Sequence, residues 1–325
     1  MTKMQNGADD DSTIISGMQD ISTFGFAGRI WEGSYKLEIF MRRPSDQYTF
    51  TPPCPIAAEY FLAPKAKQDP PSGSLTSRSQ HEHEPQQKKE PIRVIEIGAG
   101  TGFVGINLAK RLCADCTLIL TDLEKVVPLL QKNVNDNLYA TPSNTAPTFT
   151  PHPAPDTSQE ETSSPVSLLP LQNHATVTAE ALAWGDSEQA KRILSQGKID
   201  FVIASELVYF PEMYPQLLQT LKEVTDMETR VIFGYKERAF WKELPFWEQF
   251  GRFFEMEVVR IDTHDNDKEK SEEGNDEGEE KQCGVRVFGR EEEIYVFVAK
   301  KRSEDEILEG VDDTLTTLMM MEIGY

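Results

Sequence analysis

The feature that most constrains this chain is an apolar run that ends in closely spaced glycines. Residues 92–97 (IRVIEI) predict a buried strand, and Gly98, Gly100 and Gly102 follow it directly. An apolar-periodic segment that starts at Phe103 then predicts a helix. Glycines let the backbone of such a loop pass close beneath a ligand, and the helix points its free N–H groups at that ligand. The pattern predicts an α/β protein with a ligand over this loop.

Glu96 decides which ligand the loop fits best. The register from Gly100 to Gly105 formally matches a dinucleotide fingerprint, but a carboxylate directly before the first glycine would repel a pyrophosphate. The same carboxylate can accept a hydrogen bond from an ammonium group. S-adenosylmethionine carries an ammonium and a sulfonium and has no phosphate, so we predict that Glu96, Gly98, Gly100 and Gly102 bind this cofactor. A nicotinamide dinucleotide and a turn without a nucleotide are the weaker alternatives.

Composition excludes several classes of protein. With 325 residues, 38% of them hydrophobic, the chain can bury one substantial core, and no apolar run approaches the roughly 18 residues of a membrane span. Cys113 and Cys116 form a lone C-x-x-C without a second pair, so we expect no metal site. The N-terminus lacks the basic and apolar regions of a signal peptide, and we expect a protein of the cytoplasm or the nucleus.

Most of the net charge of −21 lies in two segments. Residues 262–282 hold ten acids against three lysines, and residues 303–325 hold seven acids and no base. The rest of the chain is only mildly acidic, and phosphate binding needs basic patches, so nucleic acid is not an expected partner. The acidic segments could attract a basic protein or could be solvated and disordered, and the second interpretation is the simpler one.

Strands and helices alternate from residue 92 onward, as a parallel sheet with right-handed crossovers requires. A strand and a loop before the closing strand suit an antiparallel edge. We therefore predict a Rossmann-like α/β fold with a seven-stranded, mostly parallel sheet and an antiparallel last strand. The predicted strands are residues 92–97, 117–120, 175–182, 199–204, 230–235, 255–262 and 292–300.

Segments of different composition flank and interrupt this domain. Residues 23–42 alternate apolar and polar residues around a glycine, which predicts a hairpin before the main fold, and residues 53–62 predict a short helix. The predicted organisation is a disordered tail (1–20), a hairpin and helix (21–63), a flexible linker (64–91), the main domain (92–302) with low-complexity insertions (140–174 and 263–284), and an acidic tail (303–325).

Polar and aromatic residues follow the predicted strands at the edge where ligands of open α/β sheets bind. Asp122 ends the second strand, where a carboxylate can bind ribose hydroxyls, although it could instead cap the next helix. Trp184 follows the third strand and could cover an adenine face or pack in the core. Ser205, Glu206 and Tyr209 follow the fourth strand, so we expect this loop to face the methyl donor, with Ser205 among the cofactor-binding residues.

Together these motifs resemble a known family. The pattern from Glu96 to Gly102 is similar to the first motif of the seven-strand (class I) S-adenosylmethionine-dependent methyltransferases. Glu206-x-x-Tyr209 resembles the signature of the protein-lysine methyltransferases that modify non-histone proteins (methyltransferase family 16), in which the acid is usually Asp. The run TDLEKVVPLLQKN and the YKER at residues 235–238 are most similar to the fungal members that methylate translation elongation factor 1-alpha.

The resemblance implies a protein-lysine N-methyltransferase, expected to be a monomer, that acts on elongation factor 1-alpha or a chaperone. In such an enzyme Glu206 accepts a hydrogen bond from the substrate ε-amine and Tyr209 walls the lysine channel; helix capping by Glu206 and packing by Tyr209 are the alternatives. Many members carry a tryptophan just before the helix that leads into the sheet, where this chain has prolines at 52, 53 and 55. A small-molecule methyltransferase and a non-catalytic cofactor-binding module are the competing functions.

Overall fold

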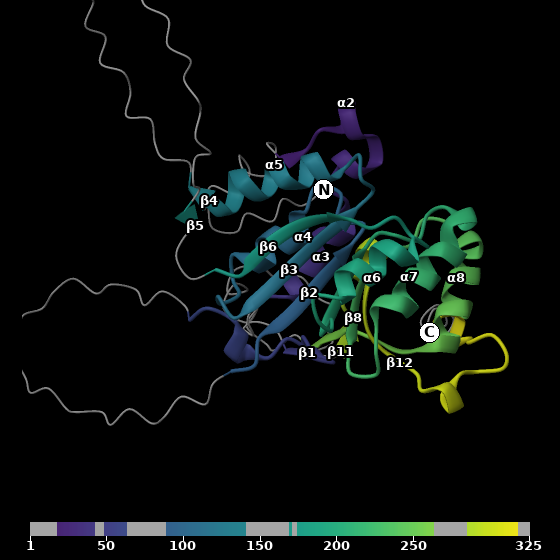
Figure 1. The fold of residues 1–325 in the computed structure, drawn as a ribbon. Coiled ribbons are helices and arrows are strands. Elements are labelled where there is room, and N and C mark those ends of the chain that lie inside the picture. The colour runs from purple at the N-terminus through teal and green to yellow at the C-terminus, as the bar shows by residue number, and fades with distance from the viewer. Residues whose placement is uncertain are drawn as a thin grey trace, which may run out of the picture.

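The computed structural model describes residues 18–42, 49–63, 89–140, 169–170, 174–262 and 285–317. Their centre is a seven-stranded sheet with helices on both faces (Figure 1). In spatial order its strands are β6 (Thr176–Ala181), β3 (Cys116–Asp122), β2 (Ile92–Ile97), β7 (Phe201–Ser205), β8 (Arg230–Lys236), β12 (Ile294–Lys301) and β9 (Phe254–Val258).

The directions of the strands confirm the predicted fold class. The strands from β6 to β8 run parallel to their neighbours, whereas β12 pairs antiparallel with both β8 and β9. The chain builds outward from β2 through β3 to β6 on one side, and then from β7 to β8 on the other. The strand order therefore reverses between β2 and β7, and ligands of such sheets bind outside the carboxyl ends of the strands at this point.

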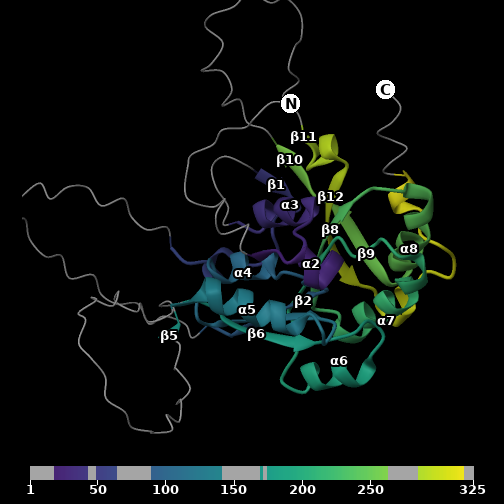
Figure 2. The ribbon, with the colours of Figure 1, turned by 90° about the horizontal axis from the view of Figure 1, so that it is seen from above.

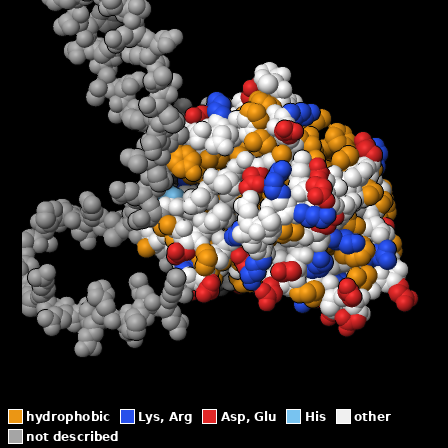
Figure 3. Space-filling view, viewed as in Figure 1, with side chains coloured by type: hydrophobic (Ala, Val, Ile, Leu, Met, Phe, Trp, Pro, Cys, Tyr) orange, Lys and Arg blue, Asp and Glu red, His pale blue; other side chains and the backbone are white. Residues whose placement is uncertain are grey.

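Helices cover the two faces of the sheet and create two hydrophobic cores. One face carries α3 (Glu32–Phe40), α4 (Phe103–Ala109) and α5 (Val127–Leu138), and the other carries α6 (Ser187–Leu194), α7 (Tyr214–Val224) and α8 (Phe240–Phe253) (Figure 2). Neighbouring residues of β2 serve different cores, since Val94 packs with α4 and Ile95 packs with α6 and α7. On the surface in Figure 3, acidic and basic side chains are interspersed, with hydrophobic side chains between them.

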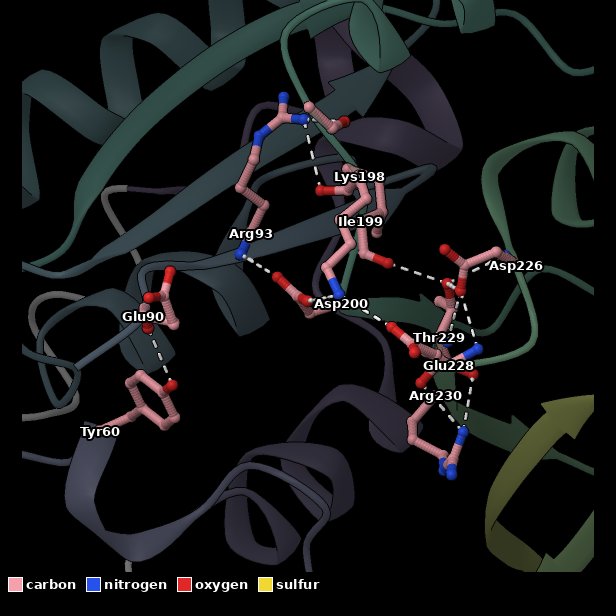
Figure 4. A network of polar contacts seen from close by, with 11 residues as sticks. Tyr60, Glu90, Arg93, Lys198, Ile199, Asp200, Asp226, Glu228, Thr229 and Arg230 are labelled. Atoms are coloured by element: carbon pink, nitrogen blue, oxygen red, sulfur yellow. Dashed lines mark hydrogen bonds and ion pairs between the residues drawn. The ribbon is translucent and has the colours of Figure 1, made fainter.

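Polar contacts fix the amino ends of the central strands (Figure 4). The Arg93 backbone N–H donates to Asp200 Oδ2 at 2.8 Å, and the Arg93 guanidinium donates to the Lys198 carbonyl at 3.4 Å. The Thr229 hydroxyl donates to the Ile199 carbonyl at 2.8 Å. These contacts hold the amino ends of β2, β7 and β8 in register.

The predicted N-terminal hairpin is wrong, because this segment forms helices. A short helix, α2 (Ile21–Phe24), and a 3-10 turn precede α3. The buried residues Gly33, Leu37 and Phe40 recur at helical spacing within α3. A Cβ on Gly234 of β8 would lie 2.6 Å from the Leu37 side chain, so α3 packs closely against the sheet. The same residues also alternate between apolar and polar, and this alternation led to the prediction of a hairpin.

The helix predicted at residues 53–62 is also wrong. Ala58–Tyr60 form a single 3-10 turn, because the prolines before it restrict the backbone. The strand predicted at residues 255–262 is divided between two sheets, since its second half is β10 (Arg260–Asp262). β10 lies between β1 (Thr49–Thr51) and β11 (Val285–Val287) in a separate three-stranded sheet.

The tails and insertions lie only partly within the described residues. Met18 is buried and its carbonyl accepts a hydrogen bond from Asn133, while Leu315 is buried in the core beside α8. Each of the two predicted tails, 1–20 and 303–325, therefore contains an apolar residue that packs against the fold. β4 (Tyr139–Ala140) pairs with β5 (Leu169–Pro170) across the predicted insertion. The remaining parts of these predicted segments, 1–17, 64–88, 141–168, 171–173, 263–284 and 318–325, lie outside the described residues.

The described helices do not have the length and hydropathy of a membrane-spanning helix. None of them is both long enough and apolar enough to cross a bilayer. The longest, α8, has 14 residues, whereas a span needs about 20.

Candidate functional site

A cavity of about 630 Å³ lies at the carboxyl ends of β2, β3 and β7, where the strand order reverses. Small-molecule sites typically have volumes of roughly 300 to 1,000 Å³, so this one is large enough for a nucleoside-sized ligand. Of the predicted site residues, those that line the cavity are Glu96, Gly98, Gly100, Asp122, Trp184, Ser205, Glu206 and Tyr209. Gly102 does not line it and lies at the start of α4.

The glycine loop connects β2 to α4 in a left-handed backbone conformation. Gly98, Gly100 and Gly102 have φ angles of 62°, 55° and 76°, which residues with a side chain rarely adopt. A Cβ on Gly100 would lie 2.8 Å from the carbonyl oxygen of Ala27, so the N-terminal segment closes over this loop. The loop is thus shaped both by its own backbone and by a segment more than 70 residues earlier.

Glu96 is a buried carboxylate directly beneath the loop. Its side chain reaches the first turn of α4, where Oε2 accepts the Gly105 N–H at 2.9 Å. No other described residue donates a hydrogen bond to this carboxylate, which is 3% exposed. Burial raises the pKa of Glu96 to about 8, and the hydrogen bond from Gly105 only partly opposes this rise. A cationic ligand group in the cavity would therefore find a carboxyl group with an oxygen to spare.

Asp122 holds the loop in place from the end of β3. Its Oδ2 accepts the Gly100 N–H at 2.8 Å and its Oδ1 accepts the Leu123 N–H at 2.7 Å. The helix-capping alternative is wrong, because the N-cap of α5 is Val126 and no side chain caps it. Burial raises the pKa of Asp122.

Glu206 joins three distant parts of the chain. Its backbone has a φ of 60°, an unusual value for a residue with a side chain. Oε1 accepts the Gly33 N–H at 2.6 Å, and Oε2 accepts a hydrogen bond from Arg238 Nη1 at 2.6 Å. Gly33 lies in the first turn of α3, so Glu206 accepts one of the free N–H groups at the start of a helix that is 173 residues away in sequence. Burial raises the pKa of Glu206, and Arg238 opposes this rise.

Aromatic rings surround the cavity beside Glu206. Tyr209 is 41% exposed, and its ring centroid lies 4.6 Å from that of Phe210 and 6.4 Å from that of Phe26. Trp184 makes an edge contact with Tyr209 at 6.3 Å and also packs against the core, so cavity lining and core packing both apply to it. The Ser205 hydroxyl lies 3.0 Å from the Ser34 hydroxyl and links β7 to α3.

Three prominent cavity residues, Phe26, Trp31 and Arg238, were not predicted as site residues. Arg238 follows the end of β8, and the expectation that ligands bind beyond strand ends could have identified it. Trp31 directly precedes α3, the helix that packs on the sheet. The chain thus has a tryptophan directly before a helix that packs on the sheet, although residues 52–55, where it was expected, hold prolines instead.

The strand order, the glycine loop after β2 and the acids at the ends of β2 and β3 define a Rossmann-like methyltransferase fold of class I. The chain belongs to the lysine methyltransferase family, whose model matches residues 9–148 and 159–256, more than half of the chain.

Individual relatives are similar over shorter stretches. The chain is 28% identical over 171 residues to the protein N-lysine methyltransferase METTL21A of Danio rerio, covering 53% of this chain and 61% of the relative. It is 29% identical over 170 residues to the EEF1A lysine methyltransferase 3 of Xenopus tropicalis, covering 52% and 58%. The protein-lysine N-methyltransferase EFM6 of Saccharomyces cerevisiae is 27% identical over 161 residues, covering 46% and 52%. Each match thus spans less than two thirds of the relative.

Proposed function

We propose that this protein is an S-adenosylmethionine-dependent protein-lysine N-methyltransferase. One observation carries the proposal: a single cavity contains a cofactor half, with the glycine loop, Glu96 and Asp122, and an acceptor half, with Glu206 and an aromatic rim. Membership of the lysine methyltransferase family supports the same reaction. The two halves share one space, as direct transfer between two bound molecules requires.

The chemistry of the cofactor half fits S-adenosylmethionine. Glu96 offers a buried carboxylate oxygen to which no described residue donates, and this suits the ammonium of the methionine part. Each oxygen of Asp122 already accepts one backbone N–H, and its further lone pairs can accept ribose hydroxyls. Trp184 lies beside the loop, where an apolar face can cover a base. These residues bind and orient the cofactor in our proposal.

S-adenosylmethionine, when bound, supplies an electrophilic methyl group on its sulfonium. The lysine nitrogen must be uncharged to react, although its free pKa is about 10.4. With the cofactor bound, the lone pair of this nitrogen could take up the methyl group, the sulfur would leave as a neutral thioether, and the methylated ammonium would release a proton to water. Glu206 orients the amine by accepting one of its N–H groups through a remaining lone pair, and Tyr209 walls the aliphatic part of the lysine.

The substrate we propose is a folded non-histone protein such as elongation factor 1-alpha or a chaperone. The names of two relatives point this way, since they describe methylation of EEF1A and of protein lysines. The open aromatic rim supports it as well, because an exposed ring surface can receive a side chain that protrudes from a protein. Action as a monomer in the cytoplasm or nucleus completes the proposal.

The test is incubation of the purified protein with methyl-labelled S-adenosylmethionine and an extract of its own source cells. A discrete labelled protein band, lost with Glu206→Gln, and methyl-lysine in its hydrolysate are the expected results. Label confined to small molecules would replace the proposal with a metabolite methyltransferase. Cofactor binding without any label would identify a non-catalytic module.

A further inference from the structure

We propose that Arg238 is a positioning residue that keeps the reacting amine of the substrate uncharged. The inference rests on the proposed function and assigns to one residue the task of preparing the acceptor. It concerns a guanidinium that lines the same cavity as Glu206 and Tyr209.

Arg238 is held in the cavity wall from several directions. Its Nη1 donates to Glu206 Oε2 at 2.6 Å, and its Nη2 lies 3.6 Å from Glu32 Oε2. The guanidinium carbon lies 5.3 Å from the ring centroid of Trp31, within cation–π distance. The Arg238 backbone N–H donates to Glu243 of α8 at 3.3 Å. Contacts of both side chain and backbone therefore fix where this positive charge lies.

The ion pair changes what Glu206 can offer to a lysine. A lone buried carboxylate would attract the ammonium form and hold it, which is the unreactive form. Here the charge of Glu206 is balanced by Arg238 on one oxygen, while the N-terminus of α3 contributes the Gly33 N–H to the other. The carboxylate can still accept a hydrogen bond, but an incoming ammonium meets a compensated pair and a neighbouring cation.

A like charge within a few ångströms disfavours protonation of an amine. Arg238 is one third exposed and Glu206 is 3% exposed, so water screens their field incompletely. At pH 7.5 only roughly one free lysine in a thousand is uncharged, and each unit by which the pKa falls raises that fraction about tenfold. The charged groups that face this pair are Glu32 from α3, Arg29 over Trp31, and Glu243 from α8.

The experiment measures kcat between pH 6.5 and 9.5 at saturating cofactor. The substrate is the protein that becomes labelled in the extract experiment, in purified form. The variants are Arg238→Gln, which removes the charge, and Arg238→Lys, which keeps it. Arg230→Gln is the matched control, because Arg230 begins the same strand β8 and bonds only carbonyls at its far end. For Arg238→Gln we expect the rise of kcat with pH to move up by about one unit.

This shift predicts a kcat about tenfold lower at pH 7 for Arg238→Gln, with recovery toward the wild-type value at pH 9.5. Arg238→Lys keeps the charge and should keep the pH at which kcat rises, whatever its absolute kcat, and Arg230→Gln should keep the whole wild-type profile. An equal loss at every pH would overturn the inference in favour of a purely structural role. A gain of activity at neutral pH would also overturn it, because Arg238 would then be a barrier to the substrate.

A second readout needs no catalysis. Without Arg238 the buried Glu206 has no cation, so its ionisation should destabilise the fold. The unfolding midpoint of Arg238→Gln should therefore fall further below that of the wild type as the pH rises from 5 to 8. A constant difference would overturn the inference even in an active enzyme. If the difference in unfolding midpoint depends on pH but the protein methylates nothing, the proposed function is refuted. Arg238 then has a structural role only.

Discussion

Binding of the cofactor should release a proton from Glu96. Burial raises the pKa of this carboxyl from 4.5 to about 8 in the folded protein. The folded state therefore keeps a proton that the unfolded state loses near pH 4.5, and stability falls as the pH rises from 4.5 toward 8. Pairing with the ammonium of S-adenosylmethionine favours the ionised form. At a pH between these limits, cofactor binding and loss of the proton must then occur together.

The magnitude follows from the same values. At pH 6.5 a group with a pKa of about 8 is about 97% protonated, so ionisation on binding releases close to one proton per cofactor. The rise from 4.5 to about 8 disfavours the ionised carboxylate by roughly 5 kcal/mol in the free protein. In the proposed complex the ammonium contact offsets that cost, and a ligand without a cation would not.

Isothermal titration calorimetry at pH 6.5, in buffers that differ in ionisation enthalpy, counts the released protons. The wild type should release about one, and Glu96→Gln none. Asp122→Asn is the control, because a ribose carries no charge and this variant should still release the proton. Binding without proton release by the wild type, or equal release by Glu96→Gln, would refute the assignment of Glu96 to the ammonium.

Three further substitutions test the site and the fold. Glu206→Gln breaks an ion pair whose arginine is 33% exposed; we expect a loss of roughly 2 kcal/mol, a fall of about 4 to 8 °C in unfolding midpoint, and loss of methyl transfer with cofactor affinity retained. Gly33→Ala should also lower the midpoint, although alanine favours helix, because its Cβ would lie 2.2 Å from Glu206 Oε1; a higher midpoint would contradict this close approach. Leu315→Ala should cost about 2 to 3 kcal/mol in denaturant unfolding, whereas a solvated tail predicts no change.

The sheet was predictable because its strands carry their own signals. β2, β7 and β8 are almost continuously apolar, as strands covered on both faces must be. Their alternation with helices indicated a parallel sheet. The N-terminal segment was not predictable in this way, because the helical period of α3 spans only nine residues and overlaps an alternating pattern. The pattern alone could not decide between a helix and a hairpin.

The two halves of the cavity differ in how far apart their partners lie in the sequence. Glu96 and Gly105 are nine residues apart, and Gly100 and Asp122 are 22 apart, so one strand–loop–helix unit and the next strand build the cofactor half. Its residue types and spacing are therefore interpretable from the sequence alone.

The acceptor half depends on contacts that no local pattern records. Glu206 meets Gly33 across 173 residues and Arg238 across 32, and each partner lies on a different element. One carboxylate thus contacts both the first turn of α3 and the guanidinium that follows β8. The sequence could thus identify Glu206 as a candidate, but only the assembled fold shows that Gly33 and Arg238 already donate hydrogen bonds to its carboxylate.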